Sequence, residues 1–152
     1  MTSRSPSAAK LRLLLRELGA ELAQLNHRVG THTELRDGDL ACLDLLAREG
    51  PLSPSALARL MHLHPATMTG VLDRLEKSGW IGRERDQSDR RAVLIRAIGG
   101  RARELMGLYA GMNEAIDRIA ARYDGNEIAV INDFLVRLIE AGRAANAALA
   151  RD

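Results

Sequence analysis

Residues 53–96 constrain the fold most, because two helix starts, a helix end and a polar turn follow one another closely there. Ser53-Pro54 offers a hydroxyl that can accept from free amides and a proline whose fixed torsion suits the first helical turn. His64-Pro65 repeats the proline start, and Ser78-Gly79 supplies a glycine that can end the second helix. Two helices this close must be joined by a sharp turn.

Two short strands are expected beyond this helix pair. Residues 81–85 are partly alternating in polarity, and residues 93–95 form a β-branched apolar run. The intervening residues 86–91 are polar enough to form a hairpin tip. This order of elements predicts a winged helix-turn-helix, so the first hypothesis is a protein that reads duplex DNA.

Helical patterns flank this segment on both sides. Aromatic residues make up only 3% of the chain, which favours helices over a β-sandwich. We therefore expect a mainly α (α+β) fold, a winged helix-turn-helix with long N- and C-terminal helices that form a dimerisation region. In a single domain of residues 1–152, the dimerisation helices would lie at about 8–30 and 101–150, and the DNA-binding module at about 36–98.

The long flanking helices need a partner surface. A two-fold dimer would match the symmetry of palindromic operators, whereas the alternative is that both helices cover the core of a monomer. The positions expected at a dimer interface are apolar or small and follow helical spacing: Leu11, Leu14, Leu18, Ile128, Ile131, Leu135, Leu138, Ala145 and Leu149.

Charge is distributed unevenly. The chain has 22 basic and 20 acidic residues and a net charge of +2, which barely argues for a polyanionic partner. Residues 51–101, however, contain nine basic and five acidic residues, so the positive excess lies on the winged segment.

A single cysteine, Cys42, cannot form an intrachain disulfide and fits a reducing compartment. No apolar stretch is long enough to span a bilayer, and the N-terminus lacks a signal-peptide pattern, so we expect a cytoplasmic protein with no membrane partner. Cys42 lies among the apolar positions Leu40, Leu43, Leu46 and Ala47, which predict a further helix before residue 50, and this setting favours a buried structural thiol over a redox-active one.

Several motifs together resemble the signature of MarR-family transcriptional regulators. They are Leu57-Ala58-Arg59-Leu60, residues 65–81, Arg83-Glu84-Arg85 and Asp89-Arg90-Arg91. The resemblance implies a homodimer, a recognition helix at residues 65–77 in the major groove and a wing over the adjacent minor groove. Members of the family are commonly repressors released by small aromatic or phenolic compounds, antibiotics or oxidants, which implies a small aromatic ligand as a partner. The sequence does not identify effector-binding residues.

Candidate DNA contacts cluster at the start of the recognition helix. Thr67 and Thr69 can reach base edges or sugar-phosphate, the alternative being an ordinary solvated helix face. His64, Pro65 and Gly70 are candidates for close approach to DNA, although imidazole is a poorer cap than the serine-like residue often found at this place. Arg74 could reach a phosphate, or it could form a salt bridge with Asp73, Asp44 or another acid.

The wing tip offers a second group of contacts. By resemblance, one of Arg90 and Arg91 enters the minor groove, where the negative potential is concentrated, and the other braces the wing. Asp89 is the expected partner that holds a guanidinium, with Arg91 favoured for that pair. The alternative is a charge-rich solvated turn.

Enzyme chemistry finds no support in the sequence. There is no nucleophile with a base, no phosphate-binding glycine loop and no metal-ligand cluster, so no cofactor or metal is expected. We therefore expect a sequence-specific regulator of transcription that binds double-stranded DNA, a homodimeric repressor released by a small-molecule effector. Two alternatives are a winged-helix protein-interaction module without DNA binding and a thiol-based redox-sensing regulator that uses Cys42.

Overall fold

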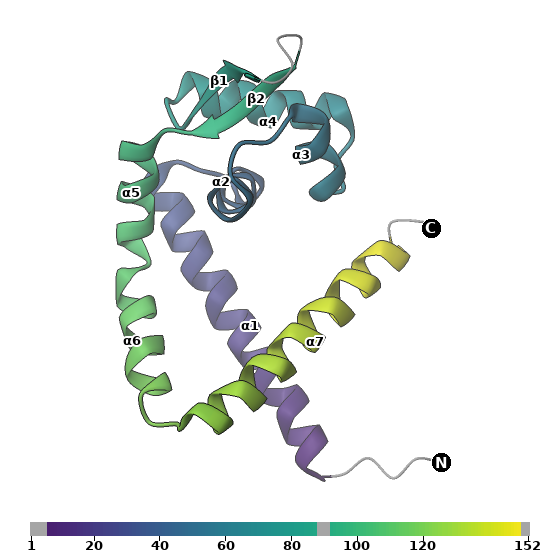
Figure 1. The fold of residues 1–152 in the computed structure, drawn as a ribbon, viewed down its shortest axis with the longest axis vertical. Helices are drawn as coiled ribbons and strands as arrows, with labels where there is room; N and C mark the ends of the chain where they lie inside the picture. Colours follow the sequence, from purple (N-terminus) through teal and green to yellow (C-terminus); the bar gives the residue numbers. More distant parts are fainter. Residues whose placement is uncertain (1–5, 88–91, 150–152) are drawn as a thin grey trace. The chain divides into compact units, whose positions relative to one another are not determined.

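The structure is a computed structural model that describes residues 6–87 and 92–149. The chain divides into two compact units, Met1–Leu105 and Met106–Asp152. In order along the chain, the elements are α1 (Pro6–Thr33), α2 (Asp37–Glu49), α3 (Pro54–Leu60), α4 (Pro65–Lys77), β1 (Ile81–Arg85), β2 (Val93–Ala97), α5 (Gly99–Leu108), α6 (Ala110–Ala120) and α7 (Gly125–Leu149) (Figure 1). This mostly helical fold with one small antiparallel sheet confirms the predicted fold class.

The helix-turn-helix begins and ends where the sequence predicts. At the start of α3, Ser53 Oγ accepts from the Ala56 amide at 3.2 Å. At the start of α4, His64 Nδ1 accepts from the Ala66 amide at 3.2 Å, so imidazole serves as the cap here. Past the end of α4, Gly79 has a φ of 74°, a conformation that glycine adopts without steric cost.

The sheet is a two-stranded hairpin whose register runs from Ile81 opposite Ala97 to Arg85 opposite Val93. On the side of β2 away from β1, Leu52 forms an isolated bridge with Ile95. The Leu52 amide donates to the Ile95 carbonyl at 3.1 Å, and the Ile95 amide donates to the Leu52 carbonyl at 2.7 Å. This bridge fixes the loop before α3 to the hairpin. Nothing in the local sequence around Leu52 predicts it.

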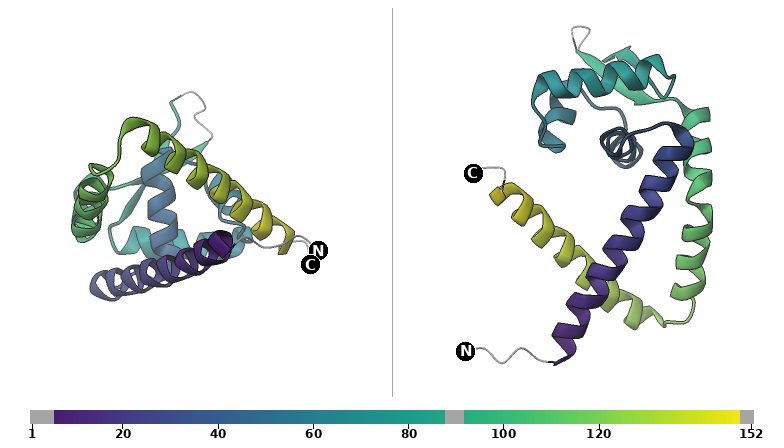
Figure 2. Two further views of the ribbon diagram at one scale, coloured as in Figure 1. Left: turned by 90° about the horizontal axis from the view of Figure 1, so that it is seen from below. Right: turned by 180° about the vertical axis from the view of Figure 1, so that it is seen from behind.

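The core of the first unit lies between α2, α3, α4 and the hairpin. α4 packs against α3, α2 and β1, and α2 also packs against β2 (Figure 2). The largest fully buried side chains are apolar and come from all of these elements: Leu57, Met68, Leu72, Leu75, Ile81, Ile95 and Cys42. Burial of such side chains provides most of the driving force that holds α4 in place.

The connection from α1 to α2 is tighter than the sequence suggests. α1 continues to Thr33 instead of ending near residue 30, and the Leu35 amide donates to the Gly30 carbonyl at 2.9 Å. A Cβ atom on Gly30 would lie 2.6 Å from the Leu35 carbonyl oxygen. Glycine is therefore required at this position by close backbone approach.

The helical pattern expected after residue 101 is interrupted. α5 ends at Leu108 and α6 begins at Ala110, because the chain turns at Tyr109. Asp124 then caps α7: its Oδ1 accepts from the amides of Asn126 and Glu127 at 2.8 and 2.9 Å. These two hydrogen bonds fix the start of the last helix within the range 101–150 that was expected to be helical.

Candidate nucleic-acid interface

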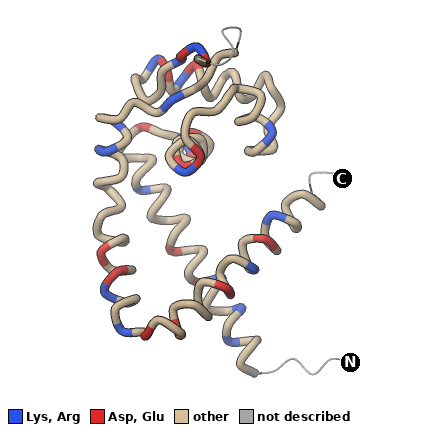
Figure 3. Tube along the Cα trace, viewed as in Figure 1, with Lys and Arg blue, Asp and Glu red and all other residues tan. Residues whose placement is uncertain are grey.

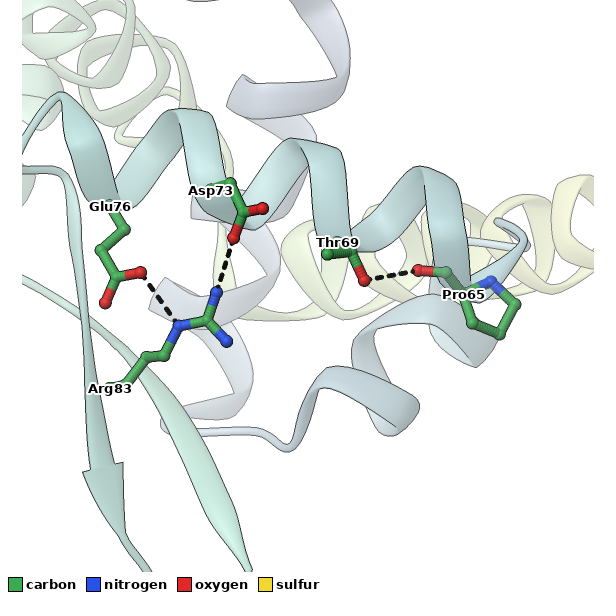
Figure 4. Close-up of polar contacts among 5 residues, drawn as sticks. All are labelled: Pro65, Thr69, Asp73, Glu76 and Arg83. Carbon is green, nitrogen blue, oxygen red and sulfur yellow. Dashed lines mark hydrogen bonds and ion pairs between the residues drawn. The ribbon is translucent and has the colours of Figure 1, made fainter.

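The helix α4 has one buried face and one exposed face. Met68, Val71, Leu72 and Leu75 are buried in the core. On the outer face, Pro65, Thr69, Asp73 and Glu76 follow one another at helical spacing and are exposed (Figure 4). The core therefore fixes which side chains α4 can offer to a partner.

Thr69 is placed to present a hydrogen-bond acceptor. Its hydroxyl donates to the Pro65 carbonyl at 3.0 Å, and its side chain is exposed (Figure 4). Because the hydroxyl proton is used within the helix, the oxygen lone pairs and the methyl group remain for an incoming molecule. Thr67 is also exposed. DNA contact by these two threonines remains a prediction.

His64 combines capping with an exposed ring. Because Nδ1 accepts from the Ala66 amide, the neutral imidazole carries its proton on Nε2. Gly70 is half-buried, and a Cβ atom there would meet only the Arg74 Nη1 atom, at 3.9 Å. Packing therefore does not require glycine at residue 70, which leaves room for a close approach from outside.

Arg74 forms an ion pair with an acid on a neighbouring helix. Its Nη2 donates to Asp39 Oδ1 on α2 at 2.8 Å, and Asp39 is only 3% exposed. The salt-bridge alternative is the one that the structure shows, and the acid is neither Asp73 nor Asp44. Since a phosphate would have to compete with this partly buried pair, Arg74 is better assigned to the packing of α2 on α4 than to the predicted DNA contacts.

Arg83 on β1 is a functional candidate that the sequence reasoning did not single out. Its Nη2 donates to Asp73 Oδ1 at 2.9 Å and its Nε donates to Glu76 Oε2 at 3.0 Å (Figure 4). One arginine thus holds both carboxylates of the outer face of α4. The signal in the sequence was present: two acids three residues apart on a helix, followed by a strand with an exposed arginine.

The wing-tip residues Asp89, Arg90 and Arg91 lie outside the described residues, and their roles remain predictions. The strands that lead to the tip are held together by backbone and side-chain contacts. The Asp86 amide donates to the Ala92 carbonyl at 3.0 Å, and Arg96 pairs with Glu84 across the hairpin at 3.1 Å. Basic and acidic residues lie intermixed in the part of the molecule that contains α4 and the hairpin (Figure 3).

Cys42 is completely buried, at 0% exposure. Burial, with a smaller contribution from the nearby Asp39 carboxylate, raises the pKa of its thiol from 9.0 to about 11. Because the thiolate is the reactive form, this environment disfavours redox chemistry at neutral pH. The structural reading of Cys42 is therefore favoured over the thiol-sensing alternative.

We expect native Cys42 to react with a thiol reagent at pH 8 at least about 100-fold more slowly than in urea, with the Cys42→Ser variant giving the baseline. Native and unfolded reaction rates within about threefold of each other would contradict the buried assignment.

The raised pKa of Cys42 also predicts a pH effect: the protonated thiol stabilises the fold fully below pH 9, and this contribution is lost as the pH rises from 9.0 to about 11.

Metal-binding and membrane-spanning features are both absent from the described part of the chain. Within residues 6–87 and 92–149, no cluster of three or more histidine, cysteine or acidic side chains could hold a metal ion. No helix in these ranges is long and apolar enough to cross a membrane.

Comparison with known proteins places these features in a family. The sequence profile of the MarR family matches residues 35–93. The chain is 28% identical over 122 residues to the HTH-type transcriptional regulator YcgE of Bacillus subtilis, covering 80% of this chain and 79% of that protein. A solved MarR family protein from Bacillus stearothermophilus is 26% identical, with a TM-score of 0.70 over 94% of this chain and 99% of that one.

A further solved structure shares the fold at lower identity. It is a MepR mutant from S. aureus bound to an oligodeoxyribonucleotide, 16% identical, with a TM-score of 0.59 over 86% of this chain and 96% of that one.

Proposed function

Because the chain belongs to the MarR family of transcriptional regulators, we propose that it is a homodimer that binds a specific sequence of double-stranded DNA through α4. We further propose that it represses transcription and that a small-molecule effector, of the aromatic kind common in the family, releases it. The observation that carries the proposal is the outer face of α4, a polar helix surface fixed by a buried opposite face. The oligonucleotide bound to the related MepR fold supports the same partner.

The start of α4 suits the major groove. A helix fits the width of this groove, and side chains in its first turns reach base edges. Pro65, Thr67 and Thr69 are exposed there, and the threonines offer hydroxyl and methyl groups that distinguish bases. In this proposal one of Arg90 and Arg91 enters the adjacent minor groove and the other braces the wing, as the family resemblance implies.

Dimerisation is supported by exposed apolar side chains on helices of both units. On α1, Leu11, Leu14 and Leu18 are 41–49% exposed, and on α7 four of the expected interface residues are 36–75% exposed: Ile131, Leu135, Leu138 and Leu149. The described residues of α6 and α7 include no buried side chain. Apolar surface of this extent is typical of an interface between subunits.

We expect Leu135→Asp to convert the dimer into a monomer at micromolar concentration. Burying a leucine contributes about 1.5–3 kcal/mol, and an aspartate at an apolar interface adds a desolvation cost in each subunit. Sedimentation equilibrium measures the effect. Asn132→Asp is the control for added charge on α7: Asn132 is an exposed polar residue outside the set of expected interface residues, and this variant should remain dimeric. Equal dimer affinity for both variants would contradict the proposed interface.

The DNA-binding proposal is tested by selecting the purified protein against random duplexes at near-physiological salt. The expected result is an enriched inverted repeat with half-sites about 10 base pairs apart, because two copies of α4 would enter successive major grooves. The selected duplex then serves to screen small aromatic acids and phenols for release. No enriched sequence would favour the alternative of a winged-helix module that binds protein.

A further inference from the structure

The outer face of α4 carries an electrostatic conflict with the proposed partner. Asp73 and Glu76 are exposed on the same side as Thr69, so α4 brings two carboxylates towards phosphate-lined DNA. Like charges brought together at an interface are unfavourable when nothing compensates them. A helix that binds DNA with this face therefore needs a cation nearby.

Arg83 provides that cation from a different element. Its Nη2–Asp73 Oδ1 distance is 2.9 Å and its Nε–Glu76 Oε2 distance is 3.0 Å. The guanidinium therefore reduces the charge of this cluster from −2 to −1. All three side chains are partly exposed, so the cluster itself adds little to stability.

The same contact also joins two elements whose relative position matters. α4 and β1 are connected by a short turn around Gly79, and Arg83 adds a side-chain link between the helix and the first strand of the wing. If α4 lies in a major groove and the wing reaches the neighbouring minor groove, the angle between them must match the duplex. Arg83 restrains that angle by holding both acids of the helix.

We propose that Arg83 is a positioning residue for DNA binding, which masks Asp73 and Glu76 and holds α4 against β1 in the geometry that the duplex requires. This inference rests on the proposed DNA-binding function. It assigns no base or phosphate contact to Arg83. Its effect passes through the two carboxylates, so removing them should remove the need for the arginine.

A double-mutant cycle tests this dependence on the selected duplex by fluorescence anisotropy. Arg83→Gln is expected to lower affinity about 10-fold or more, and less at high salt because screening weakens repulsion from the unmasked carboxylates. In a protein that already carries Asp73→Asn and Glu76→Gln, adding Arg83→Gln should lower DNA affinity less than about threefold. Because a merely structural ion pair would show the same coupling, the free energy of unfolding is the distinguishing readout: Arg83→Gln should leave it nearly unchanged while lowering DNA affinity.

Arg96→Gln is the matched control, because it removes the arginine of the exposed Arg96–Glu84 ion pair between β2 and β1. This variant should lower DNA affinity less than about threefold, since Glu84 is not on the outer face of α4. Three results would overturn the inference alone, provided that the wild type binds: no loss with Arg83→Gln, an equal loss in both backgrounds, or an equal loss with Arg96→Gln. Absence of specific binding by the wild type would overturn the proposed function as well.

Discussion

Replacing Asp39 by alanine is expected to lower the free energy of unfolding by about 3 kcal/mol, far more than the loss of an exposed ion pair on the same helix. Asp39 is 3% exposed and accepts from Arg74 at 2.8 Å and from the Arg36 amide at 3.1 Å. Its removal eliminates the link between α2 and α4 together with a cap at the start of α2.

The cost arises mainly from the partner that remains. Arg74 Nε is already buried without a hydrogen-bond partner among the described residues, so the guanidinium would be left poorly compensated. Because the Arg74 side chain is 41% exposed, water can replace part of the lost interaction, which places the effect at the low end of the range of about 3–5 kcal/mol for buried pairs.

Urea denaturation at one fixed protein concentration measures this effect, since dimerisation would make stability concentration-dependent. Asp44→Ala is the control: the Asp44–Arg48 pair is 2.9 Å long but exposed on both sides, and its loss should cost less than about 0.5 kcal/mol. Replacing Arg74 by methionine in the Asp39→Ala protein should recover part of the loss. An Asp39→Ala protein within about 1 kcal/mol of the wild type would show that the pair does not hold α4.

Thr69→Glu is expected to lower affinity for the selected duplex at least about 100-fold, equivalent to about 2.7 kcal/mol, without reducing stability. Thr69 is exposed on the outer face of α4, and its hydroxyl donates to the Pro65 carbonyl within the same helix. Glutamate favours helix more than threonine does, so the fold is retained while a third carboxylate is added beside the DNA.

Thr31→Glu is a closely matched control. The Thr31 hydroxyl donates to the His27 carbonyl at 3.0 Å on α1, the same intrahelical bond that Thr69 makes on α4. Both variants change the net charge of the chain equally, but only one changes the proposed DNA-facing surface. If Thr31→Glu weakens binding as much as Thr69→Glu does, the loss reflects overall charge, and α4 is not the reading element.

The elements whose bounds depend on local chemistry are those that the sequence predicts correctly. The proline starts at Pro54 and Pro65 and the glycine end at Gly79 involve atoms within a few residues of one another, and each is found as expected. The first strand, Ile81–Arg85, matches its predicted bounds for the same reason. The second strand continues to Ala97, two residues beyond the apolar run that predicted it, because pairing with Ile81 extends it.

The features that were missed depend on contacts between distant parts of the chain. The sequence offers several acids as salt-bridge partners for Arg74, and only the packing of α2 on α4 selects Asp39. The Arg83 cluster and the Leu52 bridge likewise require the hairpin to be placed beside α4 and the loop before α3. The turn at Tyr109 was not predicted either, because the helical spacing of apolar residues continues across it.

The most direct test of the central proposal, that two copies of α4 read successive major grooves, is binding to the selected inverted repeat with its half-sites moved apart. Inserting about five base pairs places the second half-site on the opposite side of the duplex. We expect affinity to fall to that of a single half-site, at least about 100-fold below the original repeat. Undiminished binding to the lengthened duplex would contradict the proposal that a rigid two-fold dimer binds both half-sites at once.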